Sequence, residues 1–286
     1  MKTITPTTSQ LRMLASIRSQ QWMIKPDAVQ DYALSALEAA EKSSAGPQDD
    51  EFWGQFYTLR KPMSIDGSGI AFIEIRGALL DQCAPIYEML GLATRYQTII
   101  EESEQAKTQG AKAILYLIDS PGGTVSGVIE AGEAITNIGI PTAGFCSGLA
   151  CSAGYWLLAG TGQIIASPSA IIGNIGAIIS WVDCTKFWQD MGIEFKALVS
   201  EGADLKSTFH LEPDANQLEF LQASIDEAGL NFRMHVTLGR TLAGAEFDTE
   251  VYRAGWYSGF TAMKMGLSDA IGTKQDAINY LLGTIQ

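Results

Sequence analysis

Short apolar runs of strand length alternate with helical patterns from residue 70 onward. Residues 70–75 predict a strand that ends at Arg76-Gly77, and apolar spacing predicts a helix over about 96–108. Residues 113–118 are apolar throughout, which is typical of a strand buried on both faces of a sheet. Another helical pattern follows at 125–138. This succession of strands and helices predicts an α/β layer fold.

The alternation continues through the rest of the chain. A short helix is expected after Ser152, and a long amphipathic helix is expected to begin at Pro213-Asp214. The tail, residues 255–269, predicts a turn, a short helix and a closing strand. Further strands are expected at 141–146, 163–166, 171–179 and 192–199.

The first 65 residues have a different pattern. Helical spacing predicts one short helix from about Leu11, with Trp22 beyond it, and a second that Pro26 opens. A polar, turn-rich linker follows at 43–50. We therefore expect a helical N-terminal arm and linker over 1–65, and a second domain over 66–286.

Composition and charge restrict the possible partners. The 286 residues are 47% hydrophobic, enough for a substantial core, and carry a net charge of −13. An acidic surface repels phosphate backbones, so we expect no nucleic-acid partner. No stretch approaches the ~18 uninterrupted apolar residues of a membrane span, so we expect no membrane anchor and a place in the bacterial cytoplasm or a particle assembled there. The four cysteines have no metal-ligand spacing, and we expect neither a metal nor a cofactor.

The stretch 144–154 carries the first candidate for chemistry. A strand enters a glycine-permitted turn and Ser152 then opens an apolar helix, which places one hydroxyl at a strand-to-helix corner. Backbone N–H groups of a first helical turn suit a developing oxyanion. Ser152 also fits an ordinary helix N-cap. Cys151 adjoins it, but no histidine is near in sequence to activate a thiol.

A second corner follows the apolar run at 113–118. Its sequence is Ser120-Pro121-Gly122-Gly123, and the two glycines let backbone N–H groups approach a ligand closely. The corner is either a tight turn or a second source of oxyanion donors.

A serine nucleophile also needs a base. The two histidines are His210, in a polar loop, and His235, on the long helix, where a surface or core position is expected. Lysine is the alternative base when burial depresses its pKa from about 10.4 toward neutrality, and Lys206 is the candidate. Lys196 is its rival, although alternation places it beside Glu194 on a solvated face. Ser–His and Ser–Lys arrangements both remain open on these residues.

Several motifs together resemble the signal peptide peptidase A family of serine peptidases. They occur in the family's order over roughly residues 66–275, although Ser-Pro-Gly-Gly alone is shared with Clp proteases. The matching segments are 117–123, 150–156, 173–176, 202–206, 256–259 and 269–272.

The resemblance implies a Clp/crotonase-type α/β spiral and a Ser–Lys dyad. Ser152 matches the family nucleophile and Lys206 the general base, with Gly122, Gly123 and Ala153 at the oxyanion hole. In that family the dyad can be completed across a subunit boundary, so a homo-oligomer with shared active sites is expected. The helical lead and the missing anchor are more similar to the phage head-maturation or minor-capsid proteases, which cut scaffold or capsid proteins in the procapsid.

Two departures from the family leave alternatives open. Asn174 stands where many members have a serine that hydrogen-bonds the lysine, and its amide oxygen can accept that bond. The lysine loop is also longer than in some relatives, which keeps Lys196 in play. The alternatives are a noncatalytic capsid-assembly component, a bacterial cytoplasmic signal-peptide-peptidase-like protease, and a crotonase-like acyl-CoA enzyme. A Ser–His–Asp peptidase is disfavoured because residues 153–200 contain no histidine.

Overall fold

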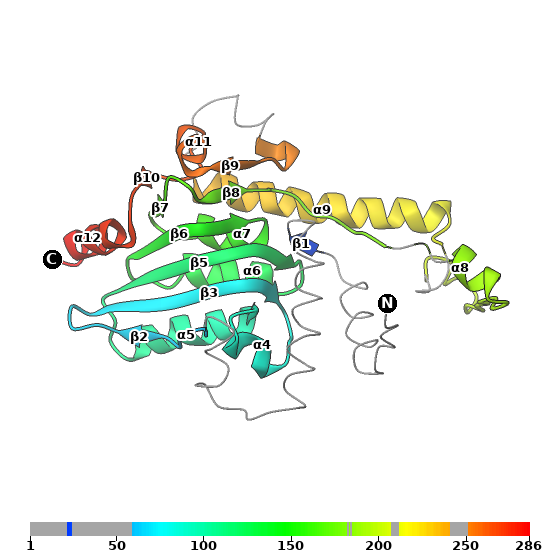
Figure 1. Cartoon of the computed structure of the whole chain (residues 1–286), viewed down its shortest axis with the longest axis horizontal. Coiled ribbons are helices and arrows are strands. Elements are labelled where there is room, and N and C mark those ends of the chain that lie inside the picture. The colour runs from blue at the N-terminus through cyan, green and yellow to red at the C-terminus, as the bar shows by residue number, and fades with distance from the viewer. Residues whose placement is uncertain (1–21, 25–58, 182, 184, 207–211, 241–250) are drawn as a thin grey trace, which may run out of the picture.

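A mostly parallel β-sheet organises the chain (Figure 1). The computed structural model describes residues 22–24, 59–181, 183, 185–206, 212–240 and 251–286. The strands are β1 (Trp22–Ile24), β2 (Ser64–Ile65), β3 (Ile70–Leu80), β4 (Ala93–Arg95), β5 (Ala113–Thr124), β6 (Thr142–Cys151), β7 (Ile164–Ala166), β8 (Ile171–Gly173), β9 (Trp256–Ser258) and β10 (Ala270–Ile271). The main path is β10-β7-β6-β5-β3-β2, parallel except for the β2–β3 pair. The predicted α/β class is confirmed.

The central strands each have two parts. Register shifts fall between Arg76 and Ala78 in β3, and between Ile118 and Ser120 in β5. Beyond these shifts the strands find new partners: β4 pairs with the end of β3, and β8 pairs with the end of β6. The register shifts and the new partners divide the sheet into two parts.

Helices cover both faces of the sheet (Figure 1). Side chains such as Ile73 and Tyr116 pack in one core with α5, α6 and α7, while Ile70 and Leu115 pack on the other face with α12. Because successive strand residues point to opposite faces, an apolar run such as 113–118 serves both cores. The helices are α4 (Pro85–Met89), α5 (Tyr96–Thr108), α6 (Val128–Thr136), α7 (Ala153–Ala159), α8 (Thr185–Asp190), α9 (Ala215–Gly239), α11 (Gly259–Lys264) and α12 (Lys274–Thr284), with a 3₁₀ turn η1 (Val251–Arg253).

The long helix α9 reaches well past the sheet. Its later turns bury Ala228, Phe232 and Val236, and its Phe232 ring packs against Trp156 of α7. Its N-terminal turns extend away from the sheet toward α8 (Figure 1). Asp214 caps the helix by accepting the Gln217 N–H, so the predicted start at Pro213-Asp214 is confirmed.

The strand predicted at 192–199 is wrong. These residues have no regular secondary structure, and Leu198 and Val199 are exposed. Alternating apolar and polar residues form a strand only where a neighbouring strand satisfies the backbone, and this segment lies in the projecting part beside α8. The strand predicted at 171–179 is shorter than expected and ends at Gly173.

The N-terminal arm lies largely outside the described residues. Its described piece, β1, is a strand, where the sequence pattern placed Trp22 beyond a first helix. The boundary predicted near residue 65 falls at β2, which pairs with β3 and so belongs to the sheet. The division into a 1–65 arm and a 66–286 domain otherwise stays a prediction.

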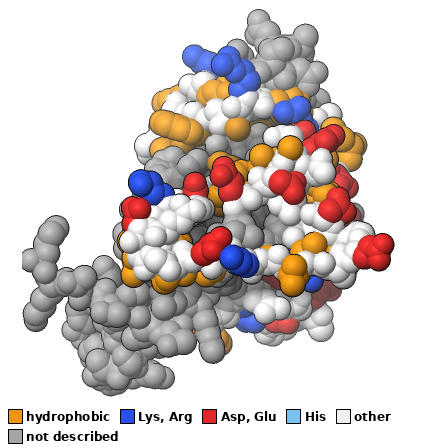
Figure 2. All heavy atoms as spheres, turned by 90° about the vertical axis from the view of Figure 1, so that its right-hand side faces the viewer, with side chains coloured by type: hydrophobic (Ala, Val, Ile, Leu, Met, Phe, Trp, Pro, Cys, Tyr) orange, Lys and Arg blue, Asp and Glu red, His pale blue; other side chains and the backbone are white. Residues whose placement is uncertain are grey.

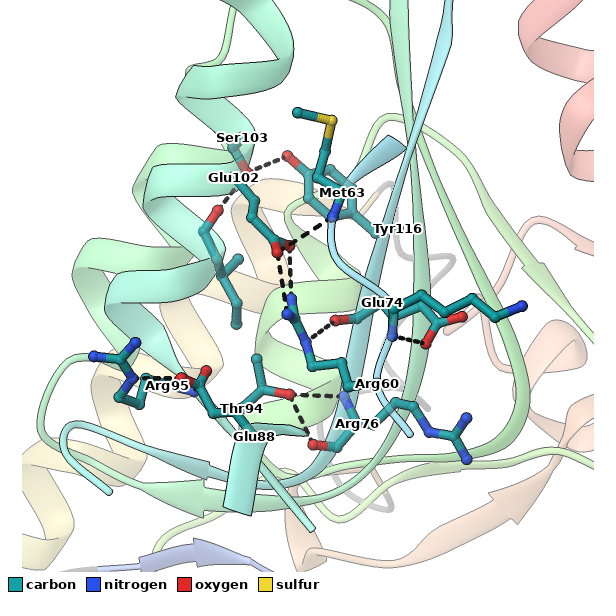
Figure 3. A network of polar contacts seen from close by, with 12 residues as sticks. Arg60, Met63, Glu74, Arg76, Glu88, Thr94, Arg95, Glu102, Ser103 and Tyr116 are labelled. Carbon is teal, nitrogen blue, oxygen red and sulfur yellow. Dashed lines mark hydrogen bonds and ion pairs between the residues drawn. The ribbon is translucent and has the colours of Figure 1, made fainter. Parts of the chain in front are cut away.

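The segment just before β2 is fixed to α5 by a buried ion pair and to β3 by a backbone contact (Figure 3). The Arg60 guanidinium donates to both carboxylate oxygens of Glu102 at 3.0 and 2.6 Å, and Arg60 Nε donates to Glu74 O at 2.9 Å. The Met63 N–H donates to the same carboxylate at 3.3 Å. Both charged side chains are almost fully buried, so each depends on the other for its partner.

No helix in the described ranges combines the length and the apolar character that a bilayer span needs.

Candidate active site

Ser152 occupies a strained corner between β6 and α7. It is the N-cap of α7, its φ and ψ are 53° and −122°, and it is 1% exposed. Few residues other than glycine adopt such a positive φ, so the surrounding structure must hold it there. Its N–H donates to Gly173 O at 2.8 Å, and its carbonyl accepts from Tyr155 and Trp156. The predicted strand-to-helix corner is therefore present, with a backbone that an ordinary N-cap does not need.

The Ser152 hydroxyl has one long protein contact. Its Oγ lies 3.4 Å from Gly176 O, near the upper limit for a hydrogen bond. The neighbouring Cys151 thiol is buried and directed at Ile171 O, 3.7 Å away. The Ser152 hydroxyl is thus held at this corner by a single long contact among those to the described residues.

The second predicted corner is a continuation of β5. Ser120 Oγ donates to Gly77 O at 2.7 Å and accepts the Gly122 N–H at 3.1 Å. Gly122 has a φ of 114°, and a Cβ added to Gly123 would fall 1.8 Å from Leu79 O. Both positions therefore require glycine, and this strand presents bare backbone.

The two corners are adjacent. Ser120 pairs with Ala150, and a Cβ added to Gly154 would fall 2.9 Å from Ser120 O. The Ala153 N–H belongs to the first turn of α7 and so has no acceptor within the helix. The fold thereby brings together four predicted residues: Ser152, Ala153, Gly122 and Gly123.

Asn174 lies next to this corner, and its polar groups bond to the backbone of a neighbouring turn. Its φ is 57°, its side-chain Nδ2 donates to Ala254 O at 2.9 Å, and its backbone N–H donates to Gly255 O at 2.7 Å. These bonds attach the end of β8 to the turn before β9. A role in supporting a lysine stays a prediction.

Lys206 lies beside the first turn of α9, where this helix projects beyond the sheet. It is exposed, and Gln217, in the first turn of α9, donates to the carbonyls of Asp204 and Lys206 at 3.1 and 3.5 Å. From Gln217 to the part of α9 that packs on α7, at Phe232, is about 22 Å along the helix axis. Within one chain, Lys206 therefore lies far from the surroundings of Ser152.

The other candidate bases have different surroundings. Lys196 is exposed and pairs with Glu194 at 3.1 Å, as expected for a solvated position. His235 Nε2 lies 2.9 Å from Trp156 O, and its ring stacks on the indole at 4.6 Å, so the residue is half-buried against α7. Burial lowers the pKa of His235, so the neutral ring is favoured. His210 falls outside the described residues.

Sequence reasoning missed how the segment before Ser152 is held. Asp119 Oδ1 accepts the Leu149 N–H at 3.0 Å, and a Cβ added to Gly148 would fall 2.3 Å from the same oxygen. The pairing of an aspartate at the end of one strand with a glycine on the next is a long-range contact, and only the Asp-Ser-Pro-Gly-Gly run hinted at it. Among the described side chains, no group of three or more metal-ligating residues is clustered.

The chain is similar in sequence to several known proteases. Capsid assembly protease C of Escherichia phage lambda is 27% identical over 89% of this chain and 57% of its own length. Protease 4 of Salmonella typhi is 29% identical over 78% of this chain and 35% of its own length. A solved structure of the 1510-N membrane-bound stomatin-specific protease aligns over 72% of this chain and 76% of its own, with 15% identity and a TM-score of 0.40.

A family model matches residues 134–283, just over half of the chain, and includes Ser152 and all that follows it through most of α12. Its description is peptidase family S49. The resemblance expected from the sequence motifs is confirmed: this chain belongs to peptidase family S49.

Proposed function

We propose that this chain is a serine endopeptidase in which Ser152 is the nucleophile and Lys206 the general base. The observation that carries the proposal is the strained, buried Ser152 corner beside a strand of bare glycine backbone. Strain of this kind costs about 1–3 kcal/mol and persists where function requires it. A helix N-cap alone has no such requirement.

The chemistry follows from these positions. Ser152 Oγ attacks a peptide carbonyl carbon while Lys206 takes its proton, and the N–H groups of Gly123 and Ala153 stabilise the oxyanion. The Gly122 N–H is already bonded to Ser120 Oγ, and so it serves mainly to hold the corner. Lys206 then protonates the departing amine as the C–N bond breaks, and water hydrolyses the serine ester.

The base reaches the nucleophile from a neighbouring subunit in this proposal. The backbone of Lys206 contacts Gln217 in the first turn of α9, and α8 and this end of α9 project from the sheet (Figure 1). This projecting part of the chain exposes many large apolar side chains. Figure 2, which faces this end of the molecule, shows hydrophobic side chains in several patches with acidic ones between them. Exposed apolar surface of this kind is typical of protein contacts, and a partner that covers it would also exclude water from the lysine amine. The exposed residues are Phe187, Met191, Ile193, Leu198, Val199, Leu205, Leu218 and Phe220.

The proposed substrates are scaffold or capsid proteins processed during phage procapsid assembly, or in a prophage-encoded equivalent. Similarity to the capsid assembly protease of phage lambda over most of this chain supports this context. The chain spans about half of that protein's length, so its substrates need direct testing on proteins encoded beside its gene. A noncatalytic assembly component and a signal-peptide-peptidase-like protease of the bacterial cytoplasm are the competing outcomes.

A complementation experiment tests the shared dyad. Ser152→Ala and Lys206→Ala subunits, each inactive alone on denatured casein, are co-expressed with different tags and isolated as mixed oligomers. Random assortment places an intact serine next to an intact lysine at about one quarter of the subunit boundaries. We expect about that share of the parent activity to return.

Lys196→Ala is the matched control, because it removes an exposed lysine from the same projecting part of the chain and should leave activity unchanged. Full activity of Lys206→Ala alone would reject Lys206 as the base. Absence of casein cleavage by the parent, together with absence of cleavage of the neighbouring capsid proteins, would favour the noncatalytic component.

A further inference from the structure

The strand beside Ser152 has an edge that the main sheet leaves open. One edge of β5 pairs with β3 as far as Gly123. The other edge pairs with β6, but only as far as Ser120, because β6 then turns into Ser152 and α7. Beyond Ser120, the edge of β5 on the Ser152 side therefore has no partner from β6.

The N-terminal strand β1 takes this edge. It pairs antiparallel with β5, with Trp22 opposite Thr124, Met23 opposite Gly123 and Ile24 opposite Gly122. Since β3 holds the opposite edge at Gly122 and Gly123, β1 lies on the side from which β6 departs.

The direction of β1 is that of a peptide running into the active site. Its chain passes from Thr124 toward Gly122, and so toward Ser120 and the corner that holds Ser152. A peptide that adds to a sheet edge is held by its main chain, and bare glycine backbone permits the closest approach. The backbone of β1 thus occupies the edge of β5 that leads toward the Ser152 corner.

We propose that the β5 edge at Gly122–Thr124 is a binding site for an extended peptide, and that residues 22–24 of the same chain are its resident occupant. A substrate segment must displace β1 before it can pair with the edge. The inference rests on the proposed peptidase function, since it identifies the segment that occupies the binding edge before a substrate peptide arrives. A three-residue pairing is short enough to exchange with a longer incoming peptide.

Hydrogen exchange tests the pairing without any cleavage. In antiparallel strands alternate residues face the partner, so a Met23→Pro/Ile24→Pro variant removes at least one N–H that donates to β5, whichever residues face it. Met23→Ala/Ile24→Ala is the matched control that keeps both donors. We expect amides within 119–127 to exchange faster in the proline variant than in the parent and the alanine control, while α5 amides stay unchanged.

Peptide binding tests the consequence. The probe is a fluorescein-labelled peptide with the sequence of residues 18–28, added to full-length chains that all carry Ser152→Ala, so that the probe is not consumed. If the edge is free about 10% of the time or less in the parent, the proline variant should bind the probe about 10-fold or more tightly. If the double variant does not fold, the single prolines replace it, and only the one that removes the inward donor should act.

Equal exchange and equal probe binding in the proline variant and the parent would overturn the inference. Failure of the proposed function looks different, because casein cleavage would then be absent, or independent of Ser152, whatever the exchange rates show. If the proline variant loses exchange protection at 119–127 but the parent has no peptidase activity, then the pairing of β1 with β5 is supported and the peptidase function is rejected.

Discussion

Gly132→Ala tests how the helix that carries Ser152 is held in place. A Cβ on Gly132, in α6, would fall 2.4 Å from Nε1 of Trp156, which lies one turn after Ser152 on α7. The indole stacks on His235 at 4.6 Å, the Phe232 ring lies 5.1 Å from it, and the added Cβ would also fall 3.4 Å from His235 Cε1. The indole is buried and packed against both rings, so we expect the added methyl to displace the indole together with α7 or α6.

The magnitude follows from two opposing effects. Alanine is favoured over glycine inside a helix by up to about 1 kcal/mol, whereas overpacking a core costs about 1–3 kcal/mol. Gly229, in α9, provides the matched control, since a Cβ there would meet no heavy atom within 4 Å. Gly229→Ala gains the helix preference alone. The free energy of unfolding of Gly132→Ala should therefore be about 1–3 kcal/mol below that of Gly229→Ala.

Urea unfolding followed by tryptophan fluorescence measures this difference. In thermal unfolding of a domain of this size, each kcal/mol of lost stability lowers Tm by about 2–4 °C. Gly132→Ala should therefore melt about 2–12 °C below the control. Casein cleavage should also fall, because a shift of α7 moves Ser152, and a misplacement of about 1 Å can cost about 100-fold in rate. A Gly132→Ala variant as stable and as active as Gly229→Ala would refute the packing account.

Three further predictions concern buried and positioning groups. Burial lowers the pKa of His235 below its ordinary 6.5, so its contribution to the free energy of unfolding is complete above pH 6.5 and is lost as the pH falls through the lowered pKa. The free energy of unfolding should therefore drop more between pH 7.5 and 5 in the parent than in His235→Gln. Glu102→Ala leaves the Arg60 guanidinium buried without its carboxylate and should cost about 3–5 kcal/mol in urea unfolding; a loss below about 1 kcal/mol would contradict the buried pair. Asp119→Ala removes the acceptor for the Leu149 N–H and should lower kcat on casein with little change in Tm, whereas Asp119→Asn keeps an acceptor oxygen and should retain most activity.

The sequence was most informative where local pattern and tertiary structure agree. The helix expected over 96–108 matches α5, because its apolar spacing faces the sheet. The strand expected at 113–118 continues to Thr124, because pairing with β3 carries it through the glycines, which local preference alone would assign to a turn. The strand expected at 192–199 is absent, because alternation cannot supply a neighbouring strand.

The candidate site divides in the same way. Ser152 and the glycines could be found from residue type and from their positions at strand ends. The Asp119 contact with Leu149 and the β1 pairing with Gly122 could not, because each joins residues 30 or more positions apart and depends on backbone groups, at Leu149 and along β1, that any sequence provides. The relation between Lys206 and Ser152 involves a neighbouring subunit in our proposal, which neither local pattern nor a single folded chain can supply.

The central claim, that Ser152 is the nucleophile, is tested most directly by covalent labelling. A β-lactone probe that acylates activated serines is added to the parent and to Ser152→Ala, followed by intact-mass measurement and peptide mapping. The account predicts one adduct per parent chain, on Ser152, with loss of casein cleavage in proportion to labelling, and no adduct on the variant. An adduct on another residue that abolishes cleavage, or an active Ser152→Ala chain, would contradict it.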